Sequence, residues 1–268
     1  MQYKTVIVEK KNGVATLIFN RPETLNAFNG EMQEETSEAI SELGRDEETK
    51  VIIITGAGRS FSSGVDVRQE LARVAEGASG AVFENIIQGK PNIISAVLQL
   101  RRMDKPIIAA INGIAMGAGM CVALASDLRI ASERAQFSMA FILRGIIPDV
   151  GGTFLLPKLI GSGKACELMF TGDMIDVREA EQIGLVNKVV PHEELMKVTE
   201  ELANKLTKRP PVALKYAKRA IYKGLSEADL ASHLDYEVAI NRICMDTEDF
   251  KEGVKAFLEK REPVFKGR

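Results

Sequence analysis

The chain has 268 residues, of which 46% are hydrophobic and 27% are charged, with 35 Lys and Arg against 37 Asp and Glu. These values are typical of a globular protein and exclude disordered, collagen-like and low-complexity chains. The formal charge of -2 provides no overall basic field, so neither a nucleic acid nor an anionic membrane is expected as a partner.

The first 191 residues alternate short apolar segments with helical segments, which predicts an α/β fold. We expect strands in TVIVEK, VATLIF, VIIIT, IIAAI, DLRIA, QFSM, MIDV and LVNKVV, and helices at about 29–44, 81–101, 116–125, 150–170 and 177–183. Continuous apolar strands such as 51–55 are typical of strands that are buried on both faces.

The segment 68–91 is the most irregular part of this region, with three glycines and a closing Pro91. We interpret it as a mobile segment over a functional site, because irregular segments of this kind often carry function.

Residues 106–126 contain no charged residue, and a run of this length can span a membrane. However, Pro106, Asn112 and three glycines interrupt it. We therefore expect a buried strand, a turn and a helix of small residues in place of a membrane span.

After Pro191 the pattern becomes helical alone, with leucines and valines at three- and four-residue steps. We divide the chain into an α/β core, residues 1–191, and a C-terminal helical segment, residues 192–268. Ser226 and Asp229 together are typical of a capping box that opens the last long helix.

The three cysteines, Cys121, Cys166 and Cys244, are odd in number and far apart. This spacing fits neither a disulfide framework nor a metal site, so we expect no metal and a reducing, cytoplasmic compartment.

Two glycine-rich turns follow buried strands, one at 61–66 and one at 113–119. Each could present a backbone N–H at the start of a helix, where negative charge is favoured, and two converging N–H groups would form an oxyanion hole. Glycines after strands also mark ordinary tight turns, so the spacing alone leaves both readings open.

Asp149 lies in an otherwise apolar segment, IIPDVGGT. It could cap a helix that begins near Val150, because Asp is a favoured N-cap residue. Alternatively, it could be a general base whose pKa is raised by an apolar pocket.

Several segments, taken in order, resemble the crotonase (enoyl-CoA hydratase/isomerase) superfamily over nearly the whole chain. They are RPETLNA at 21–27, TGAGRSF at 55–61 with SGVD at 63–66, KPIIAAING at 105–113 through Gly119, TGDMID at 171–176 through 184–186, and EGVKAF at 252–257. The resemblance implies a crotonase spiral of repeated ββα units with a helical C-terminal segment. It also implies an acyl-CoA thioester as substrate, a homotrimer or dimer of trimers, and no cofactor apart from the coenzyme A that the substrate brings.

Residue by residue, the resemblance assigns the oxyanion N–H groups to Val65 and Ala118. It also implies a substrate-binding set made of Leu25, Ala27, Ser63, Asp66, Gly117, Phe141, Lys218, Phe265 and Lys266. Within this set, Phe141 and the 68–91 segment would line the acyl group, and Lys218 would meet a phosphate. Plain core packing also explains Phe141, and a solvated charged face also explains Lys218.

The chain departs from the hydratases of this family, which carry two glutamates where this sequence has Cys121 and Phe141. Asp149 instead falls where isomerases of the ring-1,2-epoxyphenylacetyl-CoA type carry a catalytic aspartate. The resemblance therefore implies an isomerase that shifts a double bond, or rearranges a ring, through a thioester enolate with Asp149 as acid and base. Two alternatives stay open, an enoyl-CoA hydratase and a non-catalytic protein that binds CoA esters.

Overall fold

Two sheets organise the α/β body of the chain. The computed structural model describes residues 3–76 and 89–268. In these ranges the strands are β1 (Val6–Lys11), β2 (Val14–Phe19), β3 (Val51–Gly56), β4 (Ser60–Ser62), β5 (Ile107–Ile111), β6 (Ile114–Met116), β7 (Leu128–Ser132), β8 (Gln136–Ser138), β9 (Met174–Asp176) and β10 (Lys188–Val190).

The larger sheet has the order β1-β2-β3-β5-β7-β10, and the smaller sheet has the order β4-β6-β8-β9. All neighbours are parallel except β1 with β2 and β8 with β9. Successive strand pairs, such as β5 with β6 and β7 with β8, place their first strand in the large sheet and their second in the small one. A helix then follows, so the predicted ββα repeat is confirmed.

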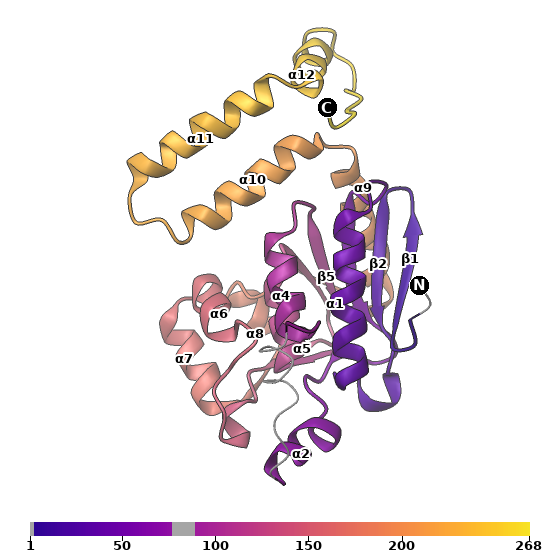
Figure 1. Ribbon diagram of the computed structural model, residues 1–268, viewed down its shortest axis with the longest axis vertical. Coiled ribbons are helices and arrows are strands. Elements are labelled where there is room, and N and C mark those ends of the chain that lie inside the picture. Colours follow the sequence, from indigo (N-terminus) through magenta and orange to yellow (C-terminus); the bar gives the residue numbers. More distant parts are fainter. Residues whose placement is uncertain (1–2, 77–88) are drawn as a thin grey trace.

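The longer helices cover the sheets or extend from them (Figure 1). They are α1 (Gly30–Arg45), α4 (Ile93–Arg102), α5 (Ala118–Ala125), α6 (Gly152–Ile160), α7 (Ser162–Thr171), α8 (Val177–Gln182), α9 (Leu195–Thr207), α10 (Pro211–Gly224), α11 (Leu230–Met245) and α12 (Glu248–Leu258). The short helical pieces are η1 (Pro22–Thr24), η2 (Val67–Leu71), α2 (Ala72–Ala75), η3 (Ile142–Arg144) and η4 (His192–Glu194).

Strand β3 is buried on both faces, as its continuous apolar sequence predicted. Ile52 and Ile54 belong to the main core between the sheets and helices α1, α4 and α5, whereas Val51 and Ile53 face the other way. On that second face, Leu195 and the rest of α9 cover the sheet.

Two predicted helices differ from the observed ones. The helix expected at 81–101 begins only at Ile93, where Asn92 accepts a hydrogen bond from the Ser95 N–H and forms a capping box. Its first part, at 81–88, lies outside the described residues. The helix expected at 150–170 divides into α6 and α7, because Gly161 at φ 78° and ψ 157° has a backbone that no α-helix can contain.

The predicted division at residue 191 does not match the packing. Helix α9 belongs to the α/β body because it covers the large sheet, whereas α10, α11 and α12 extend away from the body (Figure 1). The structural division falls at Pro210 and Pro211, between α9 and α10. A mostly apolar cavity of about 440 Å³ lies between α10 and the body.

Helix α11 begins without the capping box expected from Ser226. Asp229 is the N-cap residue, and its carboxylate accepts from the N–H groups of Ala231 and Ser232. The Ser226 hydroxyl instead accepts from Lys158 Nζ at 3.3 Å.

The uncharged stretch at 106–126 is folded as two strands and the short helix α5. Within the part of the chain that the structure describes, no helix has both the length and the apolar character needed to cross a membrane.

Candidate active site

The Val65 and Ala118 N–H groups lie in turns that follow two neighbouring strands of the small sheet. Strands β4 and β6 are parallel neighbours, so the turns that leave their carboxyl ends lie side by side. The first turn leads to Val65, and the second leads to Ala118, the first residue of α5. Among residues 3–76 and 89–268, no backbone or side-chain acceptor takes either N–H group. Both donors therefore remain available to a bound oxygen atom.

Gly64 keeps these two turns close together. Its φ is +91°, and a methyl group at this position would lie 2.8 Å from the Met116 carbonyl oxygen and 3.3 Å from the Ala118 nitrogen. The backbone before Val65 thus packs directly against the start of α5. Because that contact leaves no space for a side chain, only glycine fits here.

An aromatic cluster packs beneath the backbone of the loop that precedes Val65, on the side of the protein core. Phe19 contacts Phe28 and Phe61 edge to face, with ring centroids 5.1 Å and 5.4 Å apart. All three side chains are fully buried. Phe28 also bonds to both neighbours of Val65, because the Phe28 N–H donates to Gly64 O at 2.7 Å and Phe28 O accepts from the Asp66 N–H. The position of the Val65 N–H is therefore fixed by packing as well as by hydrogen bonds.

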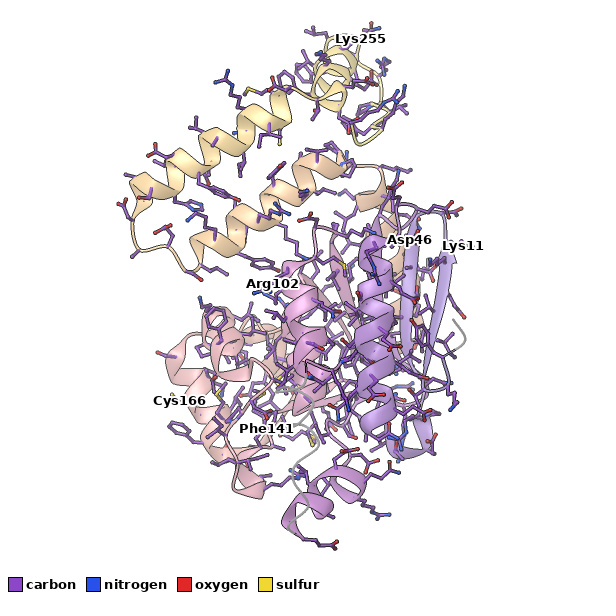
Figure 2. The ribbon with its side chains drawn as sticks, viewed as in Figure 1. Lys11, Asp46, Arg102, Phe141, Cys166 and Lys255 are labelled. Carbon is purple, nitrogen blue, oxygen red and sulfur yellow. The ribbon has the colours of Figure 1, made fainter. Side chains whose placement is uncertain are left out.

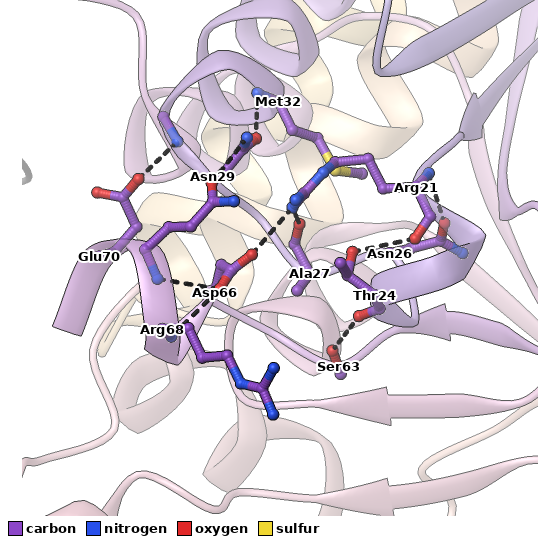
Figure 3. Close-up of polar contacts among 12 residues, drawn as sticks. Arg21, Thr24, Asn26, Ala27, Asn29, Met32, Ser63, Asp66, Arg68 and Glu70 are labelled. Carbon is purple, nitrogen blue, oxygen red and sulfur yellow. Dashed lines mark hydrogen bonds and ion pairs between the residues drawn. The ribbon is translucent and has the colours of Figure 1, made fainter. Parts of the chain in front are cut away.

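A buried ion pair fastens the same loop (Figure 3). Arg21 Nη1 lies 3.2 Å from Asp66 Oδ2 and also donates to Ala27 O, and both charged side chains are about one-tenth exposed. The other Asp66 oxygen caps the helical turn η2 by accepting from the N–H groups of Arg68 and Gln69. The Asp66 carboxylate is thus used within the protein, and its backbone N–H and C=O are paired with Phe28 O and the Glu70 N–H.

The predicted binding residues Leu25, Ala27, Ser63 and Asp66 are brought together by these contacts. The Ser63 N–H donates to Leu25 O at 3.0 Å, and the Ser63 hydroxyl donates to Thr24 O. Leu25 has a left-handed backbone at φ 56°, which turns the 21–28 loop against the 63–66 loop. The two loops form a continuous wall next to Val65.

Sequence reasoning missed Arg21 as a functional residue. The sequence places it only in the RPETLNA turn, although a charged residue two positions after the strand segment 14–19 is a signal for a buried ion pair.

Asp149 occupies a turn with unusual backbone geometry. The Gly152 N–H donates to Asp149 O at 2.9 Å, and the two central residues, Val150 and Gly151, have φ values of 52° and 82°. The N-cap residue of α6 is Gly151, and no side chain caps this helix. The helix-cap interpretation of Asp149 is therefore wrong, and its carboxylate is not required for the helix.

Burial raises the pKa of the Asp149 carboxyl above its ordinary value, although part of the side chain remains open to solvent. The apolar residues Pro148 and Val150 flank it and are themselves buried. Desolvation disfavours the charged form, so the carboxyl holds a proton more readily than an exposed aspartate does.

Cys121 and Phe141 connect this turn with α5. Cys121 lies one helical turn after Ala118, and its Sγ donates to Asp149 O at 3.5 Å. The Phe141 ring lies close to Gly117, the residue before Ala118, because a methyl group added at Gly117 would be 3.8 Å from the ring. Phe141 is 7% exposed and belongs to the main core, in the lower part of the body in Figure 2. Within the described residues, the site therefore combines the unpaired N–H groups of Val65 and Ala118 with the Phe141 ring and the Asp149 turn, whose carboxyl does not cap α6.

Lys218 lies elsewhere and does not fit its predicted phosphate role. The side chain is 9% exposed, and its Nζ donates to Asp127 Oδ2 at 2.8 Å, Lys105 O at 3.0 Å and Leu100 O at 3.3 Å. These three acceptors use all the protons of the ammonium group. The alternative of a solvated charged face is also wrong for Lys218, because the residue fastens α10 to the body.

Phe265 and Lys266 are also far from Val65 and Ala118 within one chain. They follow α12 at the opposite end of the molecule (Figure 1). The Lys266 N–H donates to Asp249 Oδ1 at 2.6 Å, and the Phe265 ring packs against Gly253 of α12.

Comparisons with known proteins agree with this arrangement. The family model described as enoyl-CoA hydratase/isomerase matches residues 9–268. A short-chain-enoyl-CoA hydratase of Clostridium acetobutylicum is 39% identical, over 97% of both chains. A 1,2-epoxyphenylacetyl-CoA isomerase of Escherichia coli is 37% identical, over 100% of both chains. The crystal structure of an enoyl-CoA hydratase from Bacillus anthracis superposes with a TM-score of 0.91 at 34% identity, over 99% of this chain and 100% of that one.

Proposed function

The chain belongs to the enoyl-CoA hydratase/isomerase family, and on that basis we propose that it is an enoyl-CoA isomerase. Its substrate is an acyl-CoA thioester with a double bond between the β- and γ-carbons, or with a ring that rearranges through the same enolate. The observation that carries the proposal is the Asp149 turn, which does not use its carboxyl to cap α6 and whose backbone oxygen accepts from Cys121 Sγ, one helical turn after Ala118.

One carboxylate is sufficient for this reaction. Asp149 takes a proton from the carbon α to the thioester, and the electron pair of that C–H bond moves onto the thioester oxygen. The N–H groups of Val65 and Ala118 stabilise the resulting enolate oxygen. When the enolate collapses, the double bond moves into conjugation, and Asp149 returns the proton to the γ-carbon. No atom is gained or lost.

Hydration is the second candidate, because the relatives include the hydratase of Clostridium acetobutylicum and a crotonyl-CoA hydratase of Syntrophomonas wolfei, which is 37% identical. Adding water requires a group that orients and deprotonates it. The positions where hydratases of the family carry glutamates hold Cys121 and Phe141. Burial raises the pKa of the Cys121 thiol far above its ordinary value, so it cannot act as a base near neutral pH.

Two substrates separate these candidates. An isomerase is expected to convert a trans-3-enoyl-CoA into the conjugated 2-enoyl-CoA and to leave a trans-2-enoyl-CoA without added water. A hydratase is expected to add the mass of one water molecule to the 2-enoyl-CoA. Measurable CoA-ester binding without turnover of either substrate would favour a non-catalytic binding protein.

The raised pKa of Asp149 predicts the pH dependence of the isomerase. The carboxyl must be ionised to take the α-proton, so kcat/KM falls as the pH drops through its pKa. Because burial raises that pKa, the fall is expected at a higher pH than for an ordinary aspartate, whose pKa is about 3.9. Initial rates measured from about pH 4 to about pH 9 test this. A decline that begins only near the ordinary aspartate value would contradict it.

We also propose that the acyl-CoA lies along the wall formed by residues 25–27 and 63–66, and that the protein assembles into a trimer or a dimer of trimers. Helix α11 buries no residue within the chain, and Leu230, Leu234 and Val238 on it are 70%, 49% and 71% exposed. Exposed apolar surface of this extent is typical of an interface. A neighbouring subunit could bring Phe265 and Lys266 to the coenzyme.

Light scattering after size-exclusion chromatography tests the assembly. The native protein is expected at a multiple of the 29.3 kDa chain mass. Val238→Asp is expected to yield smaller species, because a charge inside an apolar interface is poorly solvated. Phe170→Asp on α7, where the side chain is 73% exposed, controls for loss of apolar surface in general. A native protein that elutes as a monomer would refute the assembly.

A further inference from the structure

The backbone carbonyl of Asp149 is held at two points. It accepts from the Gly152 N–H at 2.9 Å and from Cys121 Sγ at 3.5 Å. The first contact closes the turn on itself, whereas the second joins the turn to α5. The Asp149 carboxyl does not cap α6, so the helix end does not fix its position and the backbone of the turn does.

The turn needs such support because Val150 is strained. Its φ is 52°, a left-handed backbone that a β-branched residue rarely adopts. Strain of this kind persists only where the surrounding structure fixes the conformation. Val150 is 5% exposed and packs in the main core, so its side chain holds the turn from one side. The hydrogen bond from Cys121 Sγ to Asp149 O holds the turn from a second side.

Cys121 is well suited to donate a hydrogen bond here. Its side chain is fully buried, and burial together with the nearby Asp149 keeps the pKa of the thiol above its ordinary value. The sulfur therefore keeps its proton. The space around it is also filled, since a methyl group at Gly152 would lie 3.3 Å from Cys121 Sγ and 2.5 Å from Met139 Cε.

This contact joins the two halves of the candidate active site. Helix α5 begins with the Ala118 N–H, and Cys121 lies on the next turn of the same helix. We propose that Cys121 is a positioning residue, whose S–H holds the strained Asp149 turn at a fixed place relative to the oxyanion N–H of Ala118. This inference rests on the proposed isomerase function.

Three variants test it: Cys121→Ala, which removes the donor, Cys121→Ser, which restores one, and Cys166→Ala, a control. Cys166 is exposed on α7 at the outer edge of the body (Figure 2). We expect Cys121→Ala to lower kcat for a trans-3-enoyl-CoA about tenfold, with KM changed less than about twofold. Cys121→Ser is expected to recover kcat to within about threefold of the native enzyme, and Cys166→Ala to leave it unchanged.

The melting temperature and the pH profile of each variant separate positioning from general damage. Cys121→Ala retaining full kcat, or both Cys121 variants losing kcat in proportion to their melting temperature, would overturn the inference. Asp149→Asn is measured in parallel. If that variant is inactive while Cys121→Ala is fully active, only the positioning role fails. If Asp149→Asn keeps native activity, the proposed function itself fails.

Discussion

Asp149→Asn is expected to lower the isomerase kcat by about 10²–10⁴-fold, which is the range for loss of a general acid or base. Asparagine has nearly the same shape as aspartate, but its amide cannot take the α-proton. The affinity for the acyl-CoA is expected to stay near the native value, because the binding wall of residues 25–27 and 63–66 is unchanged. Steady-state kinetics and equilibrium binding of a saturated acyl-CoA measure the two effects separately.

The stability of this variant provides an independent check. Burial raises the pKa of Asp149 in the folded protein, so folding favours the protonated carboxyl over the ionised one. The stability that the protonated carboxyl contributes is present at low pH and is lost as the pH rises through the folded-state pKa. At neutral pH, Asp149→Asn is therefore expected to melt at the same temperature as the native protein or slightly higher. Asp173→Asn, at an exposed position outside the site, removes the same charge and should leave kcat unchanged. A melting temperature of Asp149→Asn clearly below that of the native protein would indicate that Asp149 has a structural role.

Gly64→Ala is expected to lower kcat by about 10²-fold or more, which is the effect of losing one oxyanion donor. The new methyl group would meet Met116 O at 2.8 Å and the Ala118 nitrogen at 3.3 Å. The two turns must then move apart, so the N–H groups of Val65 and Ala118 no longer converge on one oxygen. The positive φ of Gly64 adds strain and is expected to lower the melting temperature as well.

Gly163→Ala is the matched control for this substitution. Gly163 lies in α7, has no positive φ and has open space where a methyl group would be. The same chemical change there is expected to leave kcat unchanged and to raise stability slightly, because alanine favours a helix. Circular dichroism confirms that both variants fold. A folded Gly64→Ala enzyme with native kcat would show that the two N–H groups do not stabilise the enolate.

The strands of the large sheet could be predicted from the sequence because β3 and β5 are continuous apolar runs and the others are short segments rich in Val, Ile and Leu. Strands β4 and β6 escaped prediction, since they lie in or beside the glycine-rich segments 61–66 and 113–119, which the sequence pattern indicates as turns. The break between α6 and α7 was also missed, because apolar periodicity continues across Gly161. Helix α9 belongs to the body because it covers the second face of the large sheet. The hydrophobic pattern of α9 itself does not show which surface it packs against.

The candidate site was also only partly predictable from the sequence. The two glycine-rich turns and Asp149 lie in segments that resemble the family, which is why the resemblance implies them as site residues. Lys218 was misread because its helical spacing suits a charged face equally well, and its partner Asp127 is 91 residues away in the chain. The Cys121 contact with Asp149 spans 28 residues and likewise appears only in the folded chain.

The most direct test of the central claim is the reaction of a trans-3-enoyl-CoA with the native enzyme and with Asp149→Asn, side by side. Ultraviolet absorbance follows the conjugated thioester, and mass spectrometry records the product. We predict conjugated product of unchanged mass from the native enzyme and almost none from the variant. Product that has gained the mass of water, or equal rates from the two proteins, would contradict isomerisation by Asp149.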